Sequence, residues 1–383
     1  MSRPRTVLLA PDSFKGSLDA ASVAAHLAAG LRAADPTLDV RSAPIGDGGE
    51  GTVAALLAAG WERRTAPVSG PTGEPVEATY AVEGRTALVE LAESSGLGRL
   101  PGGRLAPWRA DTRGVGEQVR AAVASGARTV IVGLGGSAST DGGTGLLQAL
   151  GARVLDTKGR PVGPGAAHLA DVALVDLAPA RALLAGVELV VACDVDSPLV
   201  GPRGAARVFG PQKGLGHDEL DPVDDTLAAL AAAVGHDPAT PGAGAAGGTG
   251  YALLALGARF EPGIEVVTRL TGLAAAVARA DLVVVGEGRL DEQSLAGKGP
   301  VGVARTARDA GVRAVAVVGS CAVAPEHLAA AGLAEVLELV SLEPDVERCR
   351  ARAGPLLEAL AHRLVPHAHA PVPSRAEPAP GRG

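Results

Sequence analysis

Paired acids and glycines mark one short stretch near the N-terminus. Gly46–Thr52 holds two carboxylates, Asp47 and Glu50, three residues apart among four glycines. Glycine lets the backbone approach a ligand closely, and paired carboxylates suit metal binding or the activation of a hydroxyl group. A plain turn would not require two acids. The stretch therefore indicates a chemical role.

A second stretch combines a lysine with small polar side chains. Asp12–Ser17 contains Ser13, Lys15 and Ser17 and precedes a predicted helix. Backbone amides at a helix N-terminus and an ammonium group together suit an anion such as a phosphate or a carboxylate. The same residues could instead cap the helix and leave Lys15 in solvent. The stretch alone leaves both alternatives open.

Lysine is rare in this chain. Four of the 35 basic residues are lysine and each is followed by glycine, namely Lys15, Lys158, Lys213 and Lys298. In an arginine-rich composition a retained lysine favours a position that needs a compact ammonium group rather than a planar guanidinium. Chance and turn preference form the simpler alternative.

The longest glycine-rich loop is Gly133–Gly143. It contains Gly133-x-Gly135-x-x-Ala138 after a predicted strand, with Asp156 further along, and this formally matches a dinucleotide-binding fingerprint. A dinucleotide-binding helix should open within the glycines, whereas Ser139–Gly143 delays it. A phosphate-binding loop therefore fits better, and an NAD-dependent oxidoreductase is kept as the alternative function.

Further acids follow other predicted strands. Asp194 and Asp196 follow one strand, and Glu287 and Asp291 follow another. The loop predicted over Gly286–Gly299 also carries Arg289, Ser294 and Lys298. Ligands of open α/β sheets bind beyond the carboxyl ends of the strands, so these side chains are candidates for a site. Structural ion pairs with Arg289 are the alternative.

These residues together favour phosphoryl transfer. The eight histidines are scattered, so neither a hydrolase triad nor a histidine-ligated metal is indicated. Acids, a few lysines and glycine loops are typical of phosphoryl transfer, where catalysis is mostly positioning and charge neutralisation by Mg²⁺ and cationic side chains. The pattern does not by itself name the acceptor.

Composition restricts the class of protein. The 383-residue chain has a formal net charge of −7, which argues against a nucleic-acid partner because nucleic acids require a basic face. No apolar run reaches the ~18 residues of a membrane span, and the N-terminal apolar run is too short for a signal peptide. The three cysteines are far apart in the sequence. We therefore expect a cytoplasmic protein without disulfides and without a membrane partner.

Strands and helices alternate at both ends of the chain, which indicates an α/β fold with a parallel sheet. We expect a discontinuous α/β domain over residues 1–60 and 278–365, a second domain over 61–277 that begins with antiparallel strands, and a disordered tail over 366–383. Local expectations include a strand at Thr6–Ala10, a helix at Asp19–Ala34 with Ser17 as its N-cap, and a strand at Leu282–Val285.

The motifs resemble those of the bacterial type I glycerate kinases. The similar segments keep the family's order over about residues 6–320; they are Asp12–Leu18, Asp47–Thr52, Gly135–Gly143, Cys193–Leu199, Phe209–Gly214, Gly244–Gly248, Gly286–Asp291 and Gln293–Lys298. The resemblance implies a flavodoxin-like domain, circularly permuted, with a second mixed α/β domain inserted. It also implies phosphorylation of D-glycerate by ATP with Mg²⁺, and favours 2-phosphoglycerate over 3-phosphoglycerate.

The resemblance also implies roles for the candidate residues. Either Asp47 or Asp194 would orient or deprotonate the glycerate hydroxyl, and Glu287 or Asp291 would place Mg²⁺. Arg289 or a lysine would hold the substrate carboxylate, and Lys15 and Lys298 would neutralise charge on the transferred phosphate. The expected substrate- and phosphate-binding residues are Ser13, Ser17, Gly48, Gly49, Glu50, Gly135, Gly136, Ser137, Asp141, Lys213 and Ser294.

Overall fold

The computed structural model describes residues 3–46, 48–292, 294–296 and 299–370. The chain forms two compact units. Unit 1 comprises Met1–Gly46, Ala54–Ala59 and Val267–Gly383, and unit 2 comprises Asp47–Val53 and Gly60–Val266. The last segment of unit 1 thus begins at Val267, earlier in the chain than the boundary expected near residue 278.

Unit 1 is built on five strands, which are β1 (Thr6–Pro11), β2 (Asp39–Ser42), β11 (Leu282–Leu290), β12 (Arg313–Cys321) and β13 (Leu333–Glu338). Its helices are α1 (Ala20–Ala34), α11 (Leu273–Arg279), α12 (Gly299–Asp309), α13 (Pro325–Ala330), α14 (Val346–Ala351), α15 (Ala353–Ala361) and α16 (Val365–His369). The chain passes between the units within α2 (Thr52–Ala58) and α10 (Gly263–Thr271).

The unit 1 sheet is parallel, with strand order β13-β12-β11-β1-β2. Numbered within this unit, the order is 2-1-3-4-5, which is the flavodoxin-like order. The order follows the chain as it runs, so it does not itself call for the circular permutation that the resemblance implies. It reverses between β1 and β11, and ligands of such sheets bind beyond the strand ends at this switch point.

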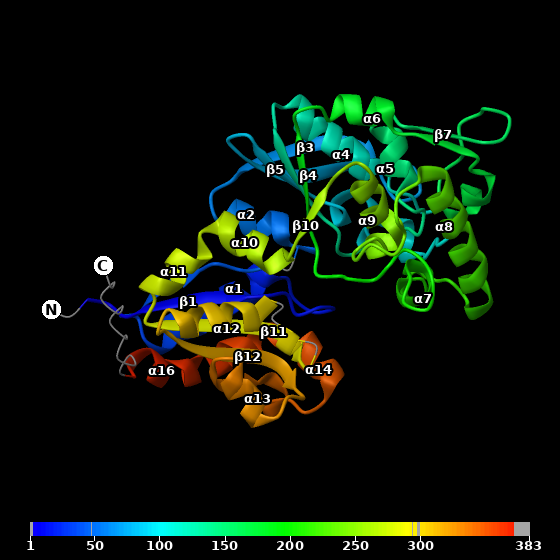
Figure 1. Ribbon diagram of the computed structural model, residues 1–383. Helices are drawn as coiled ribbons and strands as arrows, with labels where there is room; N and C mark the ends of the chain where they lie inside the picture. The colour runs from blue at the N-terminus through cyan, green and yellow to red at the C-terminus, as the bar shows by residue number, and fades with distance from the viewer. Residues whose placement is uncertain (1–2, 47, 293, 297–298, 371–383) are drawn as a thin grey trace, which may run out of the picture. The chain divides into compact units, whose positions relative to one another are not determined.

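Helices cover the unit 1 sheet. The first four residues of β11 are all buried, as expected for a central parallel strand. Leu282 and Val284 of this strand share a core with Leu27 of α1 and Leu357 of α15. Helix α12 contacts β1, β11 and β12 (Figure 1). Alternation along the strands directs one set of side chains to each layer of helices.

Unit 2 contains eight strands among its described residues, which are β3 (Glu62–Ser69), β4 (Pro75–Glu83), β5 (Thr86–Glu90), β6 (Thr129–Gly133), β7 (Arg153–Leu155), β8 (Leu174–Asp176), β9 (Glu188–Ala192) and β10 (Arg259–Glu261). Its helices are α3 (Ala92–Ser95), α4 (Arg113–Ala124), α5 (Thr144–Ala149), α6 (Ala178–Leu183), α7 (Ala205–Phe209), α8 (Leu220–Val234) and α9 (Ala245–Ala255).

The main sheet of unit 2 is mixed, with strand order β10-β9-β6-β5-β4-β3. Strands β10, β9, β6 and β5 are parallel, whereas β4 and β3 are antiparallel, as predicted for the segment after Trp61. Glu90, Gly133 and Ala192 stand in register at the carboxyl ends of β5, β6 and β9. This row is where loops that follow parallel strands come together.

The start of α1 differs from its predicted form. Asp19 is the N-cap, because its carboxylate accepts a hydrogen bond from the Ser22 amide at 2.6 Å. The predicted cap, Ser17, donates its hydroxyl to the Arg350 carbonyl oxygen instead, at 2.7 Å. The predicted N-cap was therefore wrong by two positions.

Strand β11 is longer than predicted. It continues beyond Val285 to Leu290 because Glu287 and Arg289 pair with Val318 and Ser320 of β12. Glu287 and Arg289 therefore lie on a strand and not in a loop. The strand gives the Glu287 side chain a fixed direction at the switch point.

The C-terminal tail also differs from prediction. Pro366, where disorder was expected to begin, lies inside helix α16, and Leu364 and Ala368 are buried in the unit 1 core. Residues 371–383 of the tail lie outside the described residues. In the described part of the chain, no helix has both the length and the apolar character needed to cross a membrane.

Candidate active site

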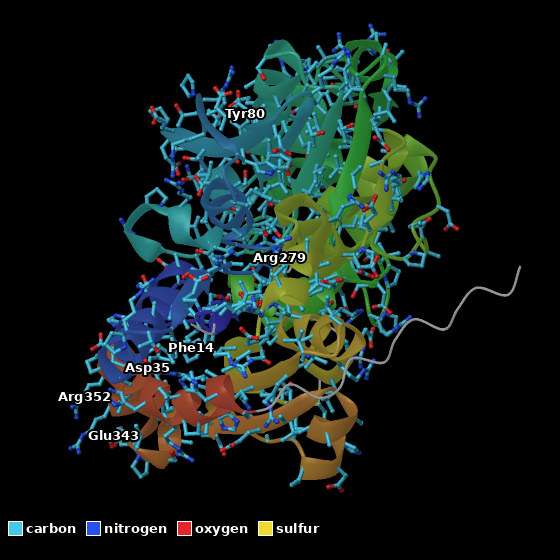
Figure 2. The ribbon with its side chains drawn as sticks, turned by 90° about the vertical axis from the view of Figure 1, so that its left-hand side faces the viewer. Phe14, Asp35, Tyr80, Arg279, Glu343 and Arg352 are labelled. Atoms are coloured by element: carbon cyan, nitrogen blue, oxygen red, sulfur yellow. The ribbon has the colours of Figure 1, made fainter. Side chains whose placement is uncertain are left out.

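Two segments meet at the switch point of unit 1. The amide of Asp12, directly after β1, donates to the Gly286 carbonyl oxygen of β11 at 2.8 Å. Phe14 anchors the loop that follows β1, because its side chain is only 3% exposed. Figure 2 labels Phe14 among the N-terminal elements. The Lys15 amide nitrogen lies 3.5 Å from the position that a Cβ on Gly288 would take. The loop that carries Lys15 therefore runs beside the end of β11.

The Glu287 carboxyl group interacts with other charged side chains at this switch point. Its Oε1 atom is buried and has no hydrogen-bond partner among the described residues. Burial raises the pKa of Glu287 to about 7, although the hydrogen bond from Ser294 lowers it. The charges of Asp12 and Asp291 raise this pKa further, and the Lys15 ammonium lowers it. Three acids and one lysine thus interact around one incompletely bonded oxygen, which a cation would stabilise.

The other residues predicted in unit 1 have varied surroundings. The Ser13 amide donates to Asp12 Oδ1 at 2.6 Å, within the same loop. The Arg289 side chain is 69% exposed and lies 3.9 Å from Asp291 Oδ2. Ser17 is bonded to the Arg350 carbonyl oxygen, so its hydroxyl is committed elsewhere. Lys298 lies outside the described residues.

In unit 2, the Gly48–Thr52 segment lies across the strand ends. A Cβ on Gly48 would stand 2.5 Å from the Ala192 carbonyl oxygen, and one on Gly133 would stand 2.5 Å from the Gly48 carbonyl oxygen. Gly48 also has a φ of 82°, a left-handed conformation that favours glycine. Its backbone therefore contacts the ends of β9 and β6 directly, a contact between protein segments that the sequence did not predict.

The Gly133–Gly143 loop also lies against the Gly48–Thr52 segment. A Cβ on Gly135 would overlap the Cα atom of Gly49, and one on Gly136 would stand 3.9 Å from Glu50 Oε2. The Glu50 side chain is exposed. Two glycine stretches that are far apart in the sequence thus lie side by side within unit 2.

Lys213 is buried against this loop. Its side chain is 1% exposed, and its ammonium donates to Ser137 Oγ at 3.1 Å and to the Ser139 carbonyl oxygen at 2.5 Å. Burial lowers the pKa of Lys213 to about 7, while the charge of Asp141 raises it. A Cβ on Gly247 would stand 2.9 Å from this ammonium nitrogen. Lys213 therefore joins the Gly133–Gly143 loop to the segment around Gly247.

That segment has an unusual backbone. Helix α9 is assigned from Ala245, but the backbone of its next three residues is not helical. Ala246, Gly247 and Gly248 have left-handed φ values of 52°, 67° and 94°. Ala246 is a non-glycine residue in a strained region, and such strain persists only where the surrounding structure enforces it.

Asp141 organises the Gly133–Gly143 loop from inside. The residue is fully buried, and its carboxylate accepts from the Thr112 amide and hydroxyl at 3.0 and 2.8 Å and from the amides of Gly143 and Gly145, each at 3.1 Å. Burial raises its pKa, and these hydrogen bonds lower it. Helix α5 begins only at Thr144, beyond the fingerprint glycines. This geometry gives no support to the oxidoreductase alternative.

Of the two candidate bases, Asp194 and Asp47, the structure describes only Asp194. Asp194 follows β9, is half-buried, and accepts a hydrogen bond at Oδ1 from the Gly263 amide at 3.1 Å. One of its oxygens therefore has a structural bond at the start of α10. Asp47 lies outside the described residues.

Sequence reasoning missed two buried acids in unit 2. Glu90 ends β5, and burial raises its pKa to about 8. Asp111 is 4% exposed; burial and then the charge of Asp141 raise its pKa to about 7. Glu90 could have been noticed, because an acid inside a predicted buried strand needs a partner. Asp111 stands in an irregular segment without such a signal.

The described residues contain no cluster of three or more His, Cys, Asp or Glu side chains that could hold a metal ion unaided. No disulfide joins the described cysteines, Cys193, Cys321 and Cys349. Unit 1 has a lysine and acids at the switch point of its parallel sheet, and unit 2 has glycine loops along its own strand ends. Both features are typical of an α/β enzyme that handles phosphate groups without a covalent nucleophile.

Comparison with known proteins agrees with this class. The model of the glycerate kinase family matches residues 7–368. The chain is 44% identical to the glycerate kinase of Bacillus subtilis (strain 168), over 82% of this chain and 85% of that protein. It is 42% identical to the glycerate 2-kinase of Escherichia coli (strain K12), with the same coverages of 82% and 85%.

A solved structure is also similar. The crystal structure of putative glycerate kinase 2 from Salmonella typhimurium LT2 matches with a TM-score of 0.77 and 36% sequence identity, over 96% of this chain and all of that chain. The chain therefore belongs to the glycerate kinase family. It is an enzyme, a phosphotransferase with an alcohol group as acceptor.

Proposed function

We propose that this enzyme transfers the γ-phosphoryl group of ATP to the 2-hydroxyl of D-glycerate with Mg²⁺, in the cytoplasm. The family match supports glycerate as the acceptor. The relative from Escherichia coli is named glycerate 2-kinase, which favours 2-phosphoglycerate over 3-phosphoglycerate. The three cysteines are far apart in the sequence, which favours a reducing compartment.

The observation that carries the proposal is the group at the unit 1 switch point. A buried carboxylate oxygen of Glu287 has no partner in the part of the chain that the structure describes, and the exposed Lys15 is close enough to lower the pKa of Glu287. A nucleotide phosphate with its cation needs both charges, an acid toward the cation and an ammonium toward the phosphate oxygens. Lys15 would neutralise phosphate charge, and Lys298 is proposed for the same role.

The residues fit Mg²⁺. Glu287 and Asp291 would hold the ion, and carboxylate oxygens are the ligands it prefers. Mg²⁺ commonly binds through one or two carboxylates together with substrate phosphates, so two acids are sufficient in this group. When bound, the ion supplies charge neutralisation on the transferred phosphoryl group.

The reaction balances as a direct displacement. The glycerate hydroxyl oxygen bonds to the γ-phosphorus while the bond to the oxygen that bridges the β- and γ-phosphates breaks, and ADP leaves. The hydroxyl proton passes to a carboxylate, Asp47 or Asp194. The exposed guanidinium of Arg289 suits the glycerate carboxylate, which it can bind with two parallel hydrogen bonds.

Unit 2 would supply backbone donors. The loops around Gly48–Gly49 and Gly135–Ser137 offer closely approached backbone, which suits anionic groups. Lys213 is bonded to Ser137 and Ser139, so we assign it to holding the loop and not to contact with phosphate.

A coupled assay of ADP release tests the activity. We expect ATP- and Mg²⁺-dependent turnover with D-glycerate that exceeds turnover with other small hydroxy acids, and phosphorus NMR of the product should show the phosphate at position 2. Absence of turnover with D-glycerate, or a 3-phosphate product, would overturn the corresponding part. Reduction of NAD by a hydroxy acid without ATP, read at 340 nm, would support the oxidoreductase alternative instead.

A matched pair of lysine variants tests the assigned charge. Lys15→Ala should lower kcat/KM by about 10²-fold or more, because an ammonium at the transferred phosphate is lost. Lys158→Ala is the control, since Lys158 is exposed and is likewise followed by glycine. Near-normal kcat/KM in Lys15→Ala would remove Lys15 from the site.

A further inference from the structure

Glu90 stands in the row of strand ends that supports the Gly48–Thr52 segment. It is the last residue of β5 and is in register with Gly133 of β6. A Cβ on Gly133 would stand 3.7 Å from Glu90 Cγ, on the side where the Gly48 carbonyl oxygen also approaches. The Glu90 side chain is 3% exposed. A carboxylate is therefore buried directly beside this segment.

The carboxylate of Glu90 is bonded to the segment itself. Its Oε1 atom accepts a hydrogen bond from the Thr52 amide at 2.5 Å, and the Val53 amide bonds the same carboxylate. The Thr52 hydroxyl in turn donates to the Gly49 carbonyl oxygen at 2.8 Å. These bonds form a continuous link from the end of β5 to the glycine-rich segment.

Burial of the Glu90 carboxyl group lowers the free energy of unfolding by more than the capping of a short helix such as α2 would require. Burial raises the pKa of Glu90 to about 8, against the lowering effect of the Val53 and Thr52 amides, and the charges of Glu93 and Glu50 raise it further. A short side chain such as Ser or Asn could cap α2 without burying an ionisable group beneath the segment. What a glutamate adds is an acceptor oxygen of longer reach, anchored on a central part of the sheet.

We propose that Glu90 is a positioning residue, whose carboxyl group fixes the Gly48–Thr52 segment on the strand ends of unit 2. The inference rests on the proposed function, which gives this segment its part in phosphoryl transfer. Glu90 itself contacts no substrate in this proposal and acts through the backbone that it holds.

Two substitutions of Glu90 separate the effect of side-chain length from the effect of the ionisable carboxyl group. Glu90→Gln keeps one carbonyl oxygen at the same reach, whereas Glu90→Asp shortens the side chain by one methylene. We expect Glu90→Asp to lower kcat about 10²-fold with KM for both substrates within about threefold, because misplacement by about 1 Å costs this much in rate. Glu90→Gln should recover most of the activity, to within about fivefold of the unmodified enzyme.

Glu117 provides the matched control. Its Oε2 atom accepts a hydrogen bond from the Ser69 amide at 2.6 Å, also within unit 2 but at the end of β3. Glu117→Asp breaks a carboxylate–amide bond of the same kind, so it should lower Tm without lowering kcat of the folded enzyme.

Hydrogen exchange without substrate separates this inference from the proposed function. The amides of Thr52 and Val53 should exchange at least tenfold faster in Glu90→Asp than in the unmodified protein or in Glu117→Asp. If these amides stay protected, or if they are released while kcat is unchanged, the inference is wrong. If the unmodified enzyme does not phosphorylate glycerate, the proposed function fails, while faster exchange in Glu90→Asp alone would still support the structural half of the inference.

Discussion

Gly133→Ala adds one methyl group where two backbone segments of unit 2 touch. Gly133 ends β6, and its new Cβ would stand 2.5 Å from the Gly48 carbonyl oxygen, whereas ordinary contact begins at 3.4 Å. The φ of Gly133 is not in the left-handed region, so the backbone conformation itself accepts alanine. The perturbation is therefore a displacement of the Gly48–Thr52 segment.

The size of the effect follows from that overlap. One of the two segments must move by about 1 Å, and overpacking of this kind costs about 1–3 kcal/mol of folding free energy. For a chain of 383 residues, that corresponds to a fall in Tm of roughly 1–4 °C. A displacement of about 1 Å at reacting groups lowers rate about 10²-fold. We therefore expect a stable enzyme with kcat lower by about two orders of magnitude.

Two control glycines make the assay decisive. Gly98→Ala adds a methyl group with no atom within 4 Å, so kcat and Tm should both stay unchanged. Gly30→Ala would overlap the Glu358 carbonyl oxygen in the packing of α1 against α15, so it should lower Tm with little change in kcat. The assay is ADP release at saturating ATP and glycerate, paired with thermal unfolding. A folded Gly133→Ala enzyme with kcat within threefold of the unmodified value would refute the reasoning.

Two further predictions concern buried charges of unit 2. Lys213→Met removes the ammonium that bonds the Ser139 carbonyl oxygen, so kcat should fall at least tenfold, while Lys158→Met, an exposed control, should have no effect on steady-state kinetics. The pKa of Asp111 is raised to about 7 by burial and by Asp141, so the protonated group stabilises the fold; this contribution is complete below the ordinary pKa of 3.8 and is lost as pH rises from there through about 7. Asp111→Asn should therefore remove up to about 4 kcal/mol of the stability loss between pH 4 and 8, measured by denaturant unfolding at each pH; an unchanged pH dependence would contradict the assignment.

The parallel sheet of unit 1 follows closely from the sequence. Val283 and its neighbours in β11 form an apolar run that only a strand buried on both faces explains, and the alternating helices require parallel pairing. The end of β11 did not follow, because Glu287 and Arg289 are polar. They join the strand through backbone pairing with β12, and side-chain patterns carry no signal for such pairing.

The glycine motifs indicated where the backbone makes close approaches, but they did not indicate the partner of each approach or the groups that support it. Gly48 and Gly135 were expected near a ligand, and their backbones contact neighbouring segments of unit 2. The groups that support them are buried far along the chain, and Glu90 in β5 is the clearest case. A supporting residue has no motif of its own, because its partner is an amide present at every non-proline position. Lys213 was found through the rarity of lysine, yet its position, bonded to Ser137, indicates support of a loop and not contact with phosphate.

Buried charge in unit 2 is concentrated at the loops and not in the packed layers. Glu90, Asp111 and Asp141 all have pKa values raised by burial, and Lys213 has one lowered by burial, so each of these groups lowers stability in its ionised form. Apolar residues of similar volume would fold more favourably, but they would leave backbone amides without acceptors. These buried charged groups lower stability, and they recur beside the backbone of the glycine loops. Proteins retain such destabilising groups where the geometry of a loop matters for the chemistry. It follows that apolar substitutions in this set, of which Lys213→Met is one, should separate the two properties, retaining or raising Tm while lowering kcat.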